Sequence, residues 1–184
     1  MAELRPPDPA PAPTRAVRLA IVLLTLSLFG CDHATKIAAE ATLARGPPVP
    51  LVAGVLELRY TINDDTAFSV LRTLGIERTP APLLAVSAFA LLLIALAWAI
   101  NARRSASRVE HVGFALVVGG ALGNVIDRAL RGHVIDFIHL TRWPVFNVAD
   151  IAVVAGVLVL VGCVLFARKS PAAATPPKAP PAPS

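Results

Sequence analysis

Four long apolar segments constrain this chain more than any other feature of its sequence. They run from about residue 16 to 41, 82 to 100, 109 to 130 and 146 to 167. A helix rises 1.5 Å per residue, so each segment can cross a bilayer core of about 30 Å. The 184 residues are 55% hydrophobic and only 16% charged, whereas a soluble domain is typically about 25% charged. The sequence therefore predicts an all-α membrane protein, a bundle of four transmembrane helices.

The first apolar segment has a second interpretation. Arg15 and Arg18 precede an uncharged run that ends in "LFGC" at Cys31, and this layout resembles the cleaved signal of a bacterial lipoprotein. Cleavage before Cys31 would discard most of a helix that residues 32–41 extend to full membrane length. A lipoprotein would also continue as a hydrophilic body, whereas three more apolar segments follow here. We therefore expect the first helix to be retained.

The remaining segments predict tails and one structured loop. Residues 1–15 and 168–184 are rich in Pro and Ala and predict disordered tails. The longest loop, 45–80, contains "VLELRYTI" (55–62), whose alternating apolar and polar residues predict a strand and a small sheet on the membrane surface. The segment 101–108 holds three arginines, which favours that loop, and hence both termini, on the cytoplasmic side.

The net charge of +5 does not indicate nucleic acid. The basic residues are scattered over tails and loop edges, and only 5% of the chain is aromatic, so no stacking platform is present. Basic residues that flank apolar spans more often anchor a protein at lipid headgroups. We therefore expect membrane lipids, and not nucleic acid, as partners.

The polar residues of the spans gather at one predicted membrane face. Because successive spans alternate in direction, the ends of the first and third spans meet the start of the fourth, opposite the arginine-rich segment. Polar side chains in membrane spans are costly and usually functional. The residues gathered in this way are Asp32, Lys36, Asn124, Asp127, Arg128, Asp136, Asn147 and Asp150.

Helical spacing accounts for some of these residues without any chemistry. Asp32 and Lys36 lie four positions apart and can form a local salt bridge. Asp127 and Arg128 can form a pair at the helix end, beside the headgroups. For Asp127 and Arg128 the spacing alone favours a structural role.

Asp136 and Asp150 are predicted to prefer different protonation states. Asp136 lies among apolar residues in "HVIDFIHL" (133–140), a setting that raises the pKa of a carboxyl. Asp150 lies in the first turn of a helix, where the dipole favours the ionised form, and Asn147 shares its face or caps the helix. Such a pair can hydrolyse an amide without a metal or cofactor. From spacing alone, the dyad and purely structural roles are equally open.

The polar residues also fit two rival functions, a metal site and a transporter. His133, Asp136 and His139 are spaced by threes, as metal ligands can be, but no His-Glu-x-x-His pattern is present and we expect no metal. Intramembrane carboxylates also mark small transporters and proton relays, which would distribute polar residues through the membrane depth. The centres of the second and fourth spans are wholly apolar, so a transporter remains only an alternative.

Taken in order, the motifs resemble lipoprotein signal peptidase (signal peptidase II), a family of aspartyl membrane proteases. The resemblance covers about residues 16–167 and rests on Asp32-x-x-Thr35-Lys36, Asn63 followed by Ala67-Phe68, "GGALGNVIDR", "HVIDF" and "FNVAD". It implies a four-helix bundle with a small extracytoplasmic β-cradle and an active site on the periplasmic side of the bacterial inner membrane. It also implies cleavage of diacylglyceryl-modified prolipoproteins just before the lipidated cysteine. We expect a monomer without cofactors.

The resemblance implies a role for each matching position. The catalytic pair would be Asp136 and Asp150. The residues that line or support the site would be Asp32, Lys36, Asn63, Asn124, Asp127, Arg128 and Asn147. Two positions depart from the family pattern, because His33 replaces a glutamine and Asp65 replaces a glycine. We expect these departures to affect substrate or inhibitor preference, and a catalytically specialised paralogue stays open as an alternative.

Overall fold

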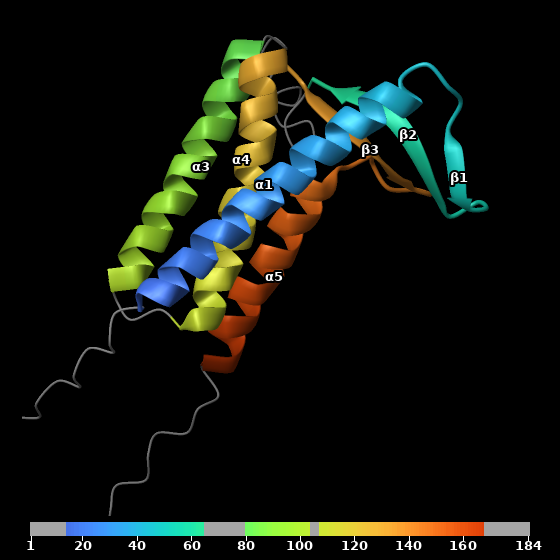
Figure 1. Cartoon of the computed structure of the whole chain (residues 1–184). Coiled ribbons are helices and arrows are strands. Elements are labelled where there is room, and N and C mark those ends of the chain that lie inside the picture. Colours follow the sequence, from blue (N-terminus) through green and yellow to red (C-terminus); the bar gives the residue numbers. More distant parts are fainter. Residues whose placement is uncertain (1–13, 65–79, 104–106, 168–184) are drawn as a thin grey trace, which may run out of the picture.

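Four helices run side by side along the molecule (Figure 1). The computed structural model describes residues 14–64, 80–103 and 107–167. Its helices are α1 (Arg15–Leu43), α3 (Pro80–Arg103), α4 (Arg108–Arg131) and α5 (Val148–Ala167). All four are long and apolar enough to cross a membrane. The predicted four-helix membrane fold is therefore confirmed, while residues 1–13 and 168–184 of the predicted tails lie outside the described residues.

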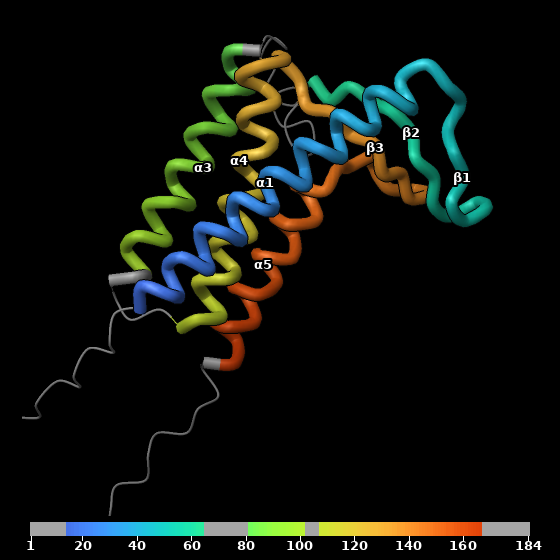
Figure 2. The backbone as a smooth tube through the Cα atoms, in the orientation of Figure 1, coloured from blue at the N-terminus to red at the C-terminus, as the bar shows by residue number. Residues whose placement is uncertain are grey.

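Helix α4 holds the bundle together. It packs against α1, α3 and α5, as the backbone trace in Figure 2 also shows. Small residues permit the closest approaches, since a Cβ added at Gly123 of α4 would lie 2.5 Å from Asp32 Oδ2 of α1, and one at Gly120 would overlap the carbonyl oxygen of Ala149 in α5. These approaches bring the polar residues of three helices within hydrogen-bonding reach.

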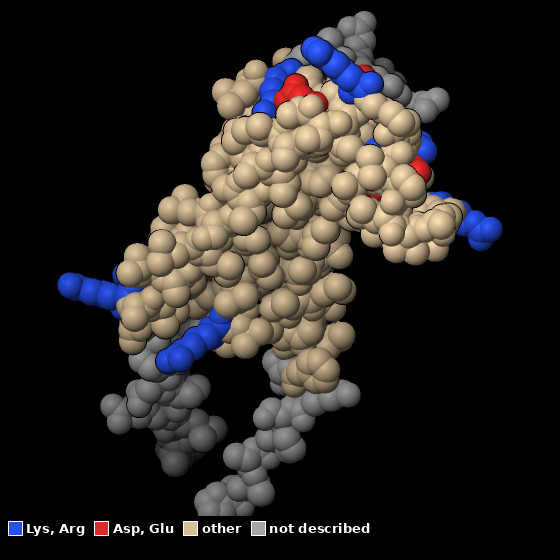
Figure 3. Space-filling model, turned by 45° about the vertical axis from the view of Figure 1, so that its right-hand side comes forward, with Lys and Arg blue, Asp and Glu red and all other residues tan. Residues whose placement is uncertain are grey.

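The outer surface of the bundle is apolar between two charged ends. Large side chains such as Leu92 of α3 and Leu158 of α5 are 62% and 66% exposed. Figure 3 shows charged side chains near the two ends of the visible face and an uncharged zone between them. An exposed apolar belt of this kind matches a surface that contacts lipid.

The helix ends follow from local chemistry. Ser107 and Glu110 form a reciprocal capping box at the start of α4, and Gly132 ends that helix in the left-handed conformation at φ 78°. Helix α1 continues without interruption through Cys31, as expected for a retained span. Helix α5 begins at Val148, two residues later than predicted, because Asn147 serves as its cap.

A three-stranded antiparallel sheet lies beside one end of the bundle, away from the start of α1 and the end of α5 (Figure 1). It consists of β1 (Val49–Val52), β2 (Leu56–Asn63) and β3 (Val134–Leu140), in that order. Strand β2 includes residues 56–62 of the predicted strand 55–62. The sheet is not built from the 45–80 loop alone, however, because β3 comes from the connection between α4 and α5. That strand was missed because its first four residues are all buried and therefore do not alternate.

The pairing of β2 with β3 places Asn63 close to Asp136. Leu58 pairs with Ile138 and Thr61 with Asp136, so β2 has one extra residue between these two pairs. The predicted single apolar face of β2 is broken by this shift, and Ile62 is 53% exposed.

A small apolar core joins the sheet to the bundle. Ala39 and Leu43 from the last turns of α1 pack with Phe137 of β3, and Leu58 and Tyr60 of β2 contact this cluster. The cluster fixes the position of β3, and with it Asp136, against the helices.

Candidate active site

The predicted site residues meet where the sheet joins the bundle. Helices α1, α4 and α5 and strands β2 and β3 each contribute to one hydrogen-bonded network. The members with direct contacts to one another are Asp32, Lys36, Asn63, Asn124, Asp127, Asp136, Asn147 and Asp150. Residues more than one hundred positions apart are thus brought together in the way that the alternating spans predicted.

Lys36 lies at the centre of the α1–α4 contact and is fully buried. Its ammonium lies 2.7 Å from Asp32 Oδ2 and 2.8 Å from Asp127 Oδ2, and it donates to Asn124 Oδ1 at 2.9 Å. The local Asp32–Lys36 salt bridge is therefore present, but it is one part of a larger network. A buried charge is tolerated only with such partners.

Asp127 does not serve simply as a partner for its neighbour Arg128. Its carboxylate pairs with Lys36 and with Arg131, one helical turn later. Arg128 reaches back to the backbone oxygen of Asn124 at 3.5 Å. Arg131 was missed as a site residue, although its i, i+4 spacing from Asp127 was a usable signal.

Asn147 joins the two aspartates that were predicted to be catalytic. Its Oδ1 accepts from the backbone N–H of Asp150 at 3.0 Å, while Asp150 Oδ2 accepts from the backbone N–H of Asn147 at 3.1 Å. This reciprocal arrangement caps α5. The Asn147 Nδ2 group donates to Asp136 Oδ1 at 2.6 Å. The same amide therefore both starts the helix that carries Asp150 and holds the carboxyl of Asp136.

Asp136 is buried and Asp150 is partly exposed. The second oxygen of Asp136 accepts from Asn63 Nδ2 at 2.8 Å. Burial raises the pKa of Asp136 to about 6; the bond from Asn63 opposes this shift and the charge of Asp150 adds to it. Asp150 Oδ1 accepts from Asn124 Nδ2 at 2.9 Å. The two carboxyls thus lie in different environments, one enclosed and one open to water.

Asp32 forms a hydrogen bond with α5 as well as a salt bridge with Lys36. Its Oδ1 accepts from the backbone N–H of Ala149 at 2.9 Å, and Ala149 lies in the first turn of α5. A carboxylate at a helix N-terminus satisfies a free N–H group and interacts favourably with the helix dipole. No sequence pattern signalled this contact, because it joins residues 117 positions apart.

The structure does not bring His139 to Asp136, its neighbour in the rival metal pattern. Residues three apart on a strand point to opposite faces, and His139 Nδ1 lies 2.8 Å from Glu57 on β2. Among the described residues, no group of three or more His, Cys, Asp or Glu side chains is arranged to hold a metal ion. His33, one of the two departures, stacks on Phe29 with ring centroids 6.0 Å apart. The other, Asp65, lies outside the described residues, as do Ala67 and Phe68.

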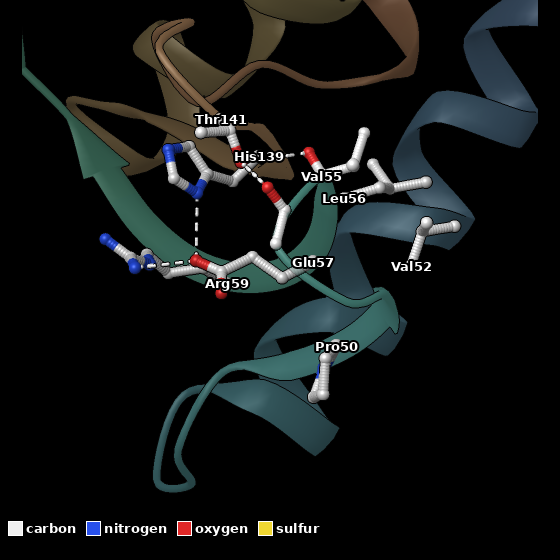
Figure 4. A pocket seen from close by; sticks show the side chains of 9 residues that line it. Pro50, Val52, Val55, Leu56, Glu57, Arg59, His139 and Thr141 are labelled. Carbon is white, nitrogen blue, oxygen red and sulfur yellow. Dashed lines mark hydrogen bonds and ion pairs between the residues drawn. The ribbon is translucent and has the colours of Figure 1, made fainter.

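A separate pocket of about 150 Å³ lies on the sheet (Figure 4). Pro50, Glu57, Arg59, His139 and Thr141 are among its lining residues, and none of the predicted site residues is. Glu57 bridges His139 and Arg59, and the hydrogen bond with His139 is the main cause of its lowered pKa. Because the aspartate pair does not line this pocket, the two features are separate.

The chemistry that this network can perform follows from its donors and acceptors. One carboxyl is enclosed and favours the protonated form, while the other faces fixed amide donors and is accessible to water. A protonated acid next to an ionised base is the arrangement required for acid–base hydrolysis of an amide. The geometry is therefore suited to an aspartic hydrolase.

Known proteins resemble this chain over most of its length. The family model described as signal peptidase (SPase) II matches residues 24–166. The lipoprotein signal peptidase of Caldicellulosiruptor bescii is 36% identical over 156 residues, which cover 81% of this chain and 97% of that protein. That of Mycobacterium tuberculosis (strain ATCC 25618 / H37Rv) is 35% identical over 167 residues, covering 85% and 76%.

The fold also matches that of a solved bacterial membrane enzyme. The alignment has a TM-score of 0.70 and 23% sequence identity, and covers 85% of this chain and 94% of the solved one. Together with the order of the motifs and the four spans, the match over most of the chain leads to one conclusion: this protein belongs to the signal peptidase II family.

Proposed function

We propose that this protein is an aspartic endopeptidase that removes the signal peptide from diacylglyceryl-modified prolipoproteins, just before the lipidated cysteine. Its family supports a protease that processes prolipoproteins. The observation that carries the aspartyl mechanism is the Asn147 side chain, which donates to Asp136 and accepts from the backbone of Asp150. This single amide ties two carboxyls with different environments into one unit.

In the proposed reaction, Asp150 is the base and Asp136 the acid. Asp150 takes a proton from a water molecule, and the resulting hydroxide attacks the scissile carbonyl carbon. Asp136 gives its proton to the carbonyl oxygen, which avoids a free oxyanion. Collapse of the tetrahedral intermediate breaks the C–N bond. The leaving amine takes up the proton that Asp150 accepted, and one hydroxyl of the intermediate returns its proton to Asp136 as the carbonyl re-forms, which restores both aspartates. No covalent bond to the enzyme forms.

The remaining network residues position this pair. Asn63 and Asn147 each donate to one oxygen of Asp136, and Asn124 donates to Asp150. Asp32 fixes the start of α5 through the Ala149 N–H. These contacts indicate that the three asparagines and Asp32 position the catalytic pair and do not take part in the chemistry. A preorganised geometry lowers the reorganisation that the reaction needs. Asp127 and Arg128 belong to the same supporting group.

We further propose a multi-pass inner-membrane monomer with both termini in the cytoplasm and the site facing the periplasm. The start of α1, the end of α3, the start of α4 and the end of α5 lie at the same end of the bundle, opposite the sheet (Figure 1). The arginine-rich sequence 101–108, which connects α3 to α4, favours the cytoplasmic side for this end. The network lies at the sheet end, where it can meet a lipidated substrate at the outer membrane surface. Concentration of the polar residues at this one end supports a protease over a transporter.

A cleavage assay with matched substrates tests the proposal. Purified protein in lipid would receive a diacylglyceryl-modified prolipoprotein and its unlipidated twin, alongside Asp136→Asn and Asp150→Asn variants. We expect cleavage of the lipidated form alone, with the new N-terminus at the lipidated cysteine, and loss of at least about a thousandfold in both variants. Full activity in either variant, or equal cleavage of the unlipidated precursor, would overturn the assignment.

A further inference from the structure

Besides its two salt bridges, Lys36 makes a hydrogen bond to the side chain of Asn124. A lysine ammonium has three hydrogens and accepts no hydrogen bond. The Lys36 ammonium forms ion pairs with Asp32 Oδ2 at 2.7 Å and Asp127 Oδ2 at 2.8 Å, and it donates a hydrogen bond to Asn124 Oδ1 at 2.9 Å. The carboxylates of Asp32 and Asp127 balance the charge of the lysine. Asn124 connects the lysine to the aspartate pair, because it also donates to Asp150.

The donors around Asn124 determine which way its amide points. Its Oδ1 receives hydrogen bonds from Lys36 Nζ and from Asn147 Nδ2, the latter at 3.1 Å. Its Nδ2 donates to Asp150 Oδ1 at 2.9 Å. If the amide were turned over, its nitrogen would face two donors and its oxygen would face a carboxylate. The orientation therefore follows from the chemistry of the neighbours and not from a choice of atom labels.

We propose that Lys36 determines, through the oriented amide of Asn124, which aspartate of the pair keeps the proton. The amide presents a donor to Asp150 and so holds it as an acceptor, and the single proton of the pair is left to Asp136. The inference rests on the proposed function and assigns Lys36 as a positioning residue that touches neither substrate nor water. Asp150 receives its second fixed donor from the backbone N–H of Asn147 at 3.1 Å.

The charge of Lys36 alone acts against this assignment, because it lowers the pKa of Asp136. The proposed effect is therefore carried by the directional contact with Asn124. Helix α1 supplies Asp32 and Lys36, α4 supplies Asp127 and Arg128, and β3 supplies Asp136. The lysine charge is shared between two carboxylates, so its directional contact with Asn124 distinguishes it from a general positive field. The enclosed setting of Asp136, whose pKa burial raises to about 6, supports the same location for the proton.

The test is a double-mutant cycle read as the pH dependence of kcat/KM. Lys36→Met removes the ammonium, Asn124→Leu removes the amide but keeps the ammonium paired with Asp32 and Asp127, and a third protein carries both changes. Lys36→Arg keeps a donor-only cation as the conservative variant. Gly113→Ala is a control for lost stability, because its Cβ would meet Leu160 at 2.9 Å in the α4–α5 contact. Helical circular dichroism and thermal unfolding in detergent verify that each protein is folded.

We expect the acidic limb of the profile to move to higher pH by about one unit or more in Lys36→Met and in Asn124→Leu. The double variant should show no larger shift than either single variant, because both interrupt the same path. Lys36→Arg and Gly113→Ala should keep the limb in place, even where kcat falls.

Two results would overturn the inference. One is an unmoved acidic limb in a folded Asn124→Leu protein, which decides the matter even if Lys36→Met does not fold. The other is shifts that simply add in the double variant. Either result leaves the proposed function intact as long as Asp136→Asn and Asp150→Asn remain inactive, whereas activity in those two variants would remove the function itself.

Discussion

Asp32 Oδ1 accepts a hydrogen bond of 2.9 Å from the backbone N–H of Ala149, which lies in a different helix. The first span of the chain thereby caps the last one. The same carboxylate holds Lys36 with its other oxygen at 2.7 Å. The start of α5, where Asp150 lies, therefore depends on a residue of α1 as well as on its own cap.

Replacing Asp32 with alanine is expected to unfold the site locally and to abolish cleavage. The change removes a helix cap and leaves a buried lysine with one carboxylate fewer, which costs about 3–5 kcal/mol when a buried pair is broken. Thermal unfolding in detergent and the cleavage assay measure the two effects. Thr42→Val is the matched control, because that hydroxyl bonds only to the Ala38 carbonyl within α1. Wild-type stability in Asp32→Ala would show that the cap contributes little.

Gly123 and Gly119 offer a paired test of the α1–α4 approach. A Cβ at Gly123 would lie 2.5 Å from Asp32 Oδ2, whereas one at Gly119 would meet Leu28 at an ordinary 3.4 Å. We expect Gly123→Ala to lose about 1–3 kcal/mol of stability through overpacking, together with most activity. Gly119→Ala should be neutral or gain up to about 1 kcal/mol from helix propensity. Equal unfolding temperatures for the two variants would contradict this difference in packing.

Two substitutions at Asn147 separate its role as the cap of α5 from its contact with Asp136. Serine also caps helices, but its shorter side chain cannot reach Asp136 as well. Asn147→Ser should therefore lose activity and about 1–3 kcal/mol of stability, because it removes a buried donor from Asp136 and Asn124. Asn147→Ala should lose activity and about 1 kcal/mol more stability than the serine variant, because the cap is lost as well. The measurements are kcat and thermal unfolding of both variants side by side. Full activity in the serine variant would mean that the contact with Asp136 is not needed.

The pKa of Asp136 predicts an unusual dependence of stability on pH. Its folded value of about 6 exceeds the ordinary 3.8, so between these values the folded state binds more protons than the unfolded state. The contribution of Asp136 to the free energy of unfolding should therefore be greatest at low pH, and it should be lost as the pH rises through about 6. Asparagine does not titrate, but its Nδ2 group would face one of the two amides that donate to Asp136. The stability of Asp136→Asn relative to wild type should therefore rise by about 2–3 kcal/mol between pH 4 and pH 7.5, on top of a cost that does not depend on pH.

Unfolding temperatures recorded at several pH values in detergent check this prediction. The difference between Asp136→Asn and wild type should move in favour of the variant as the pH rises from 4 to 7.5. Thr42→Val, at an exposed position on α1 without a titratable group, should show no such trend. A difference that stays constant with pH would show that titration of Asp136 is not its cause.

The sequence predicted the spans well because membrane burial demands long apolar runs. It also predicted which polar residues share one end of the bundle, since alternating spans leave few choices. Strand β3 was missed, because a strand buried on both faces has no alternation to read. The contacts that join Asp127 to Lys36 and Asp32 to Ala149 were not predictable either. The approach at Gly123 that makes them possible depends on how α1 crosses α4, and spacing along one helix does not encode that crossing.

The distribution of the network along the chain has a consequence for biogenesis. Lys36 lies 88 positions before Asn124, and Asp32 lies 117 before Ala149. Synthesis proceeds from the N-terminus, so α1 enters the bilayer long before the helix that it caps. A ribosome-bound chain that has not yet inserted its last span contains one aspartate of the pair and lacks Asn147. Under the proposed mechanism, an unfinished molecule therefore cannot cut neighbouring precursors at the translocon, and proteolysis begins only when the fourth helix has docked.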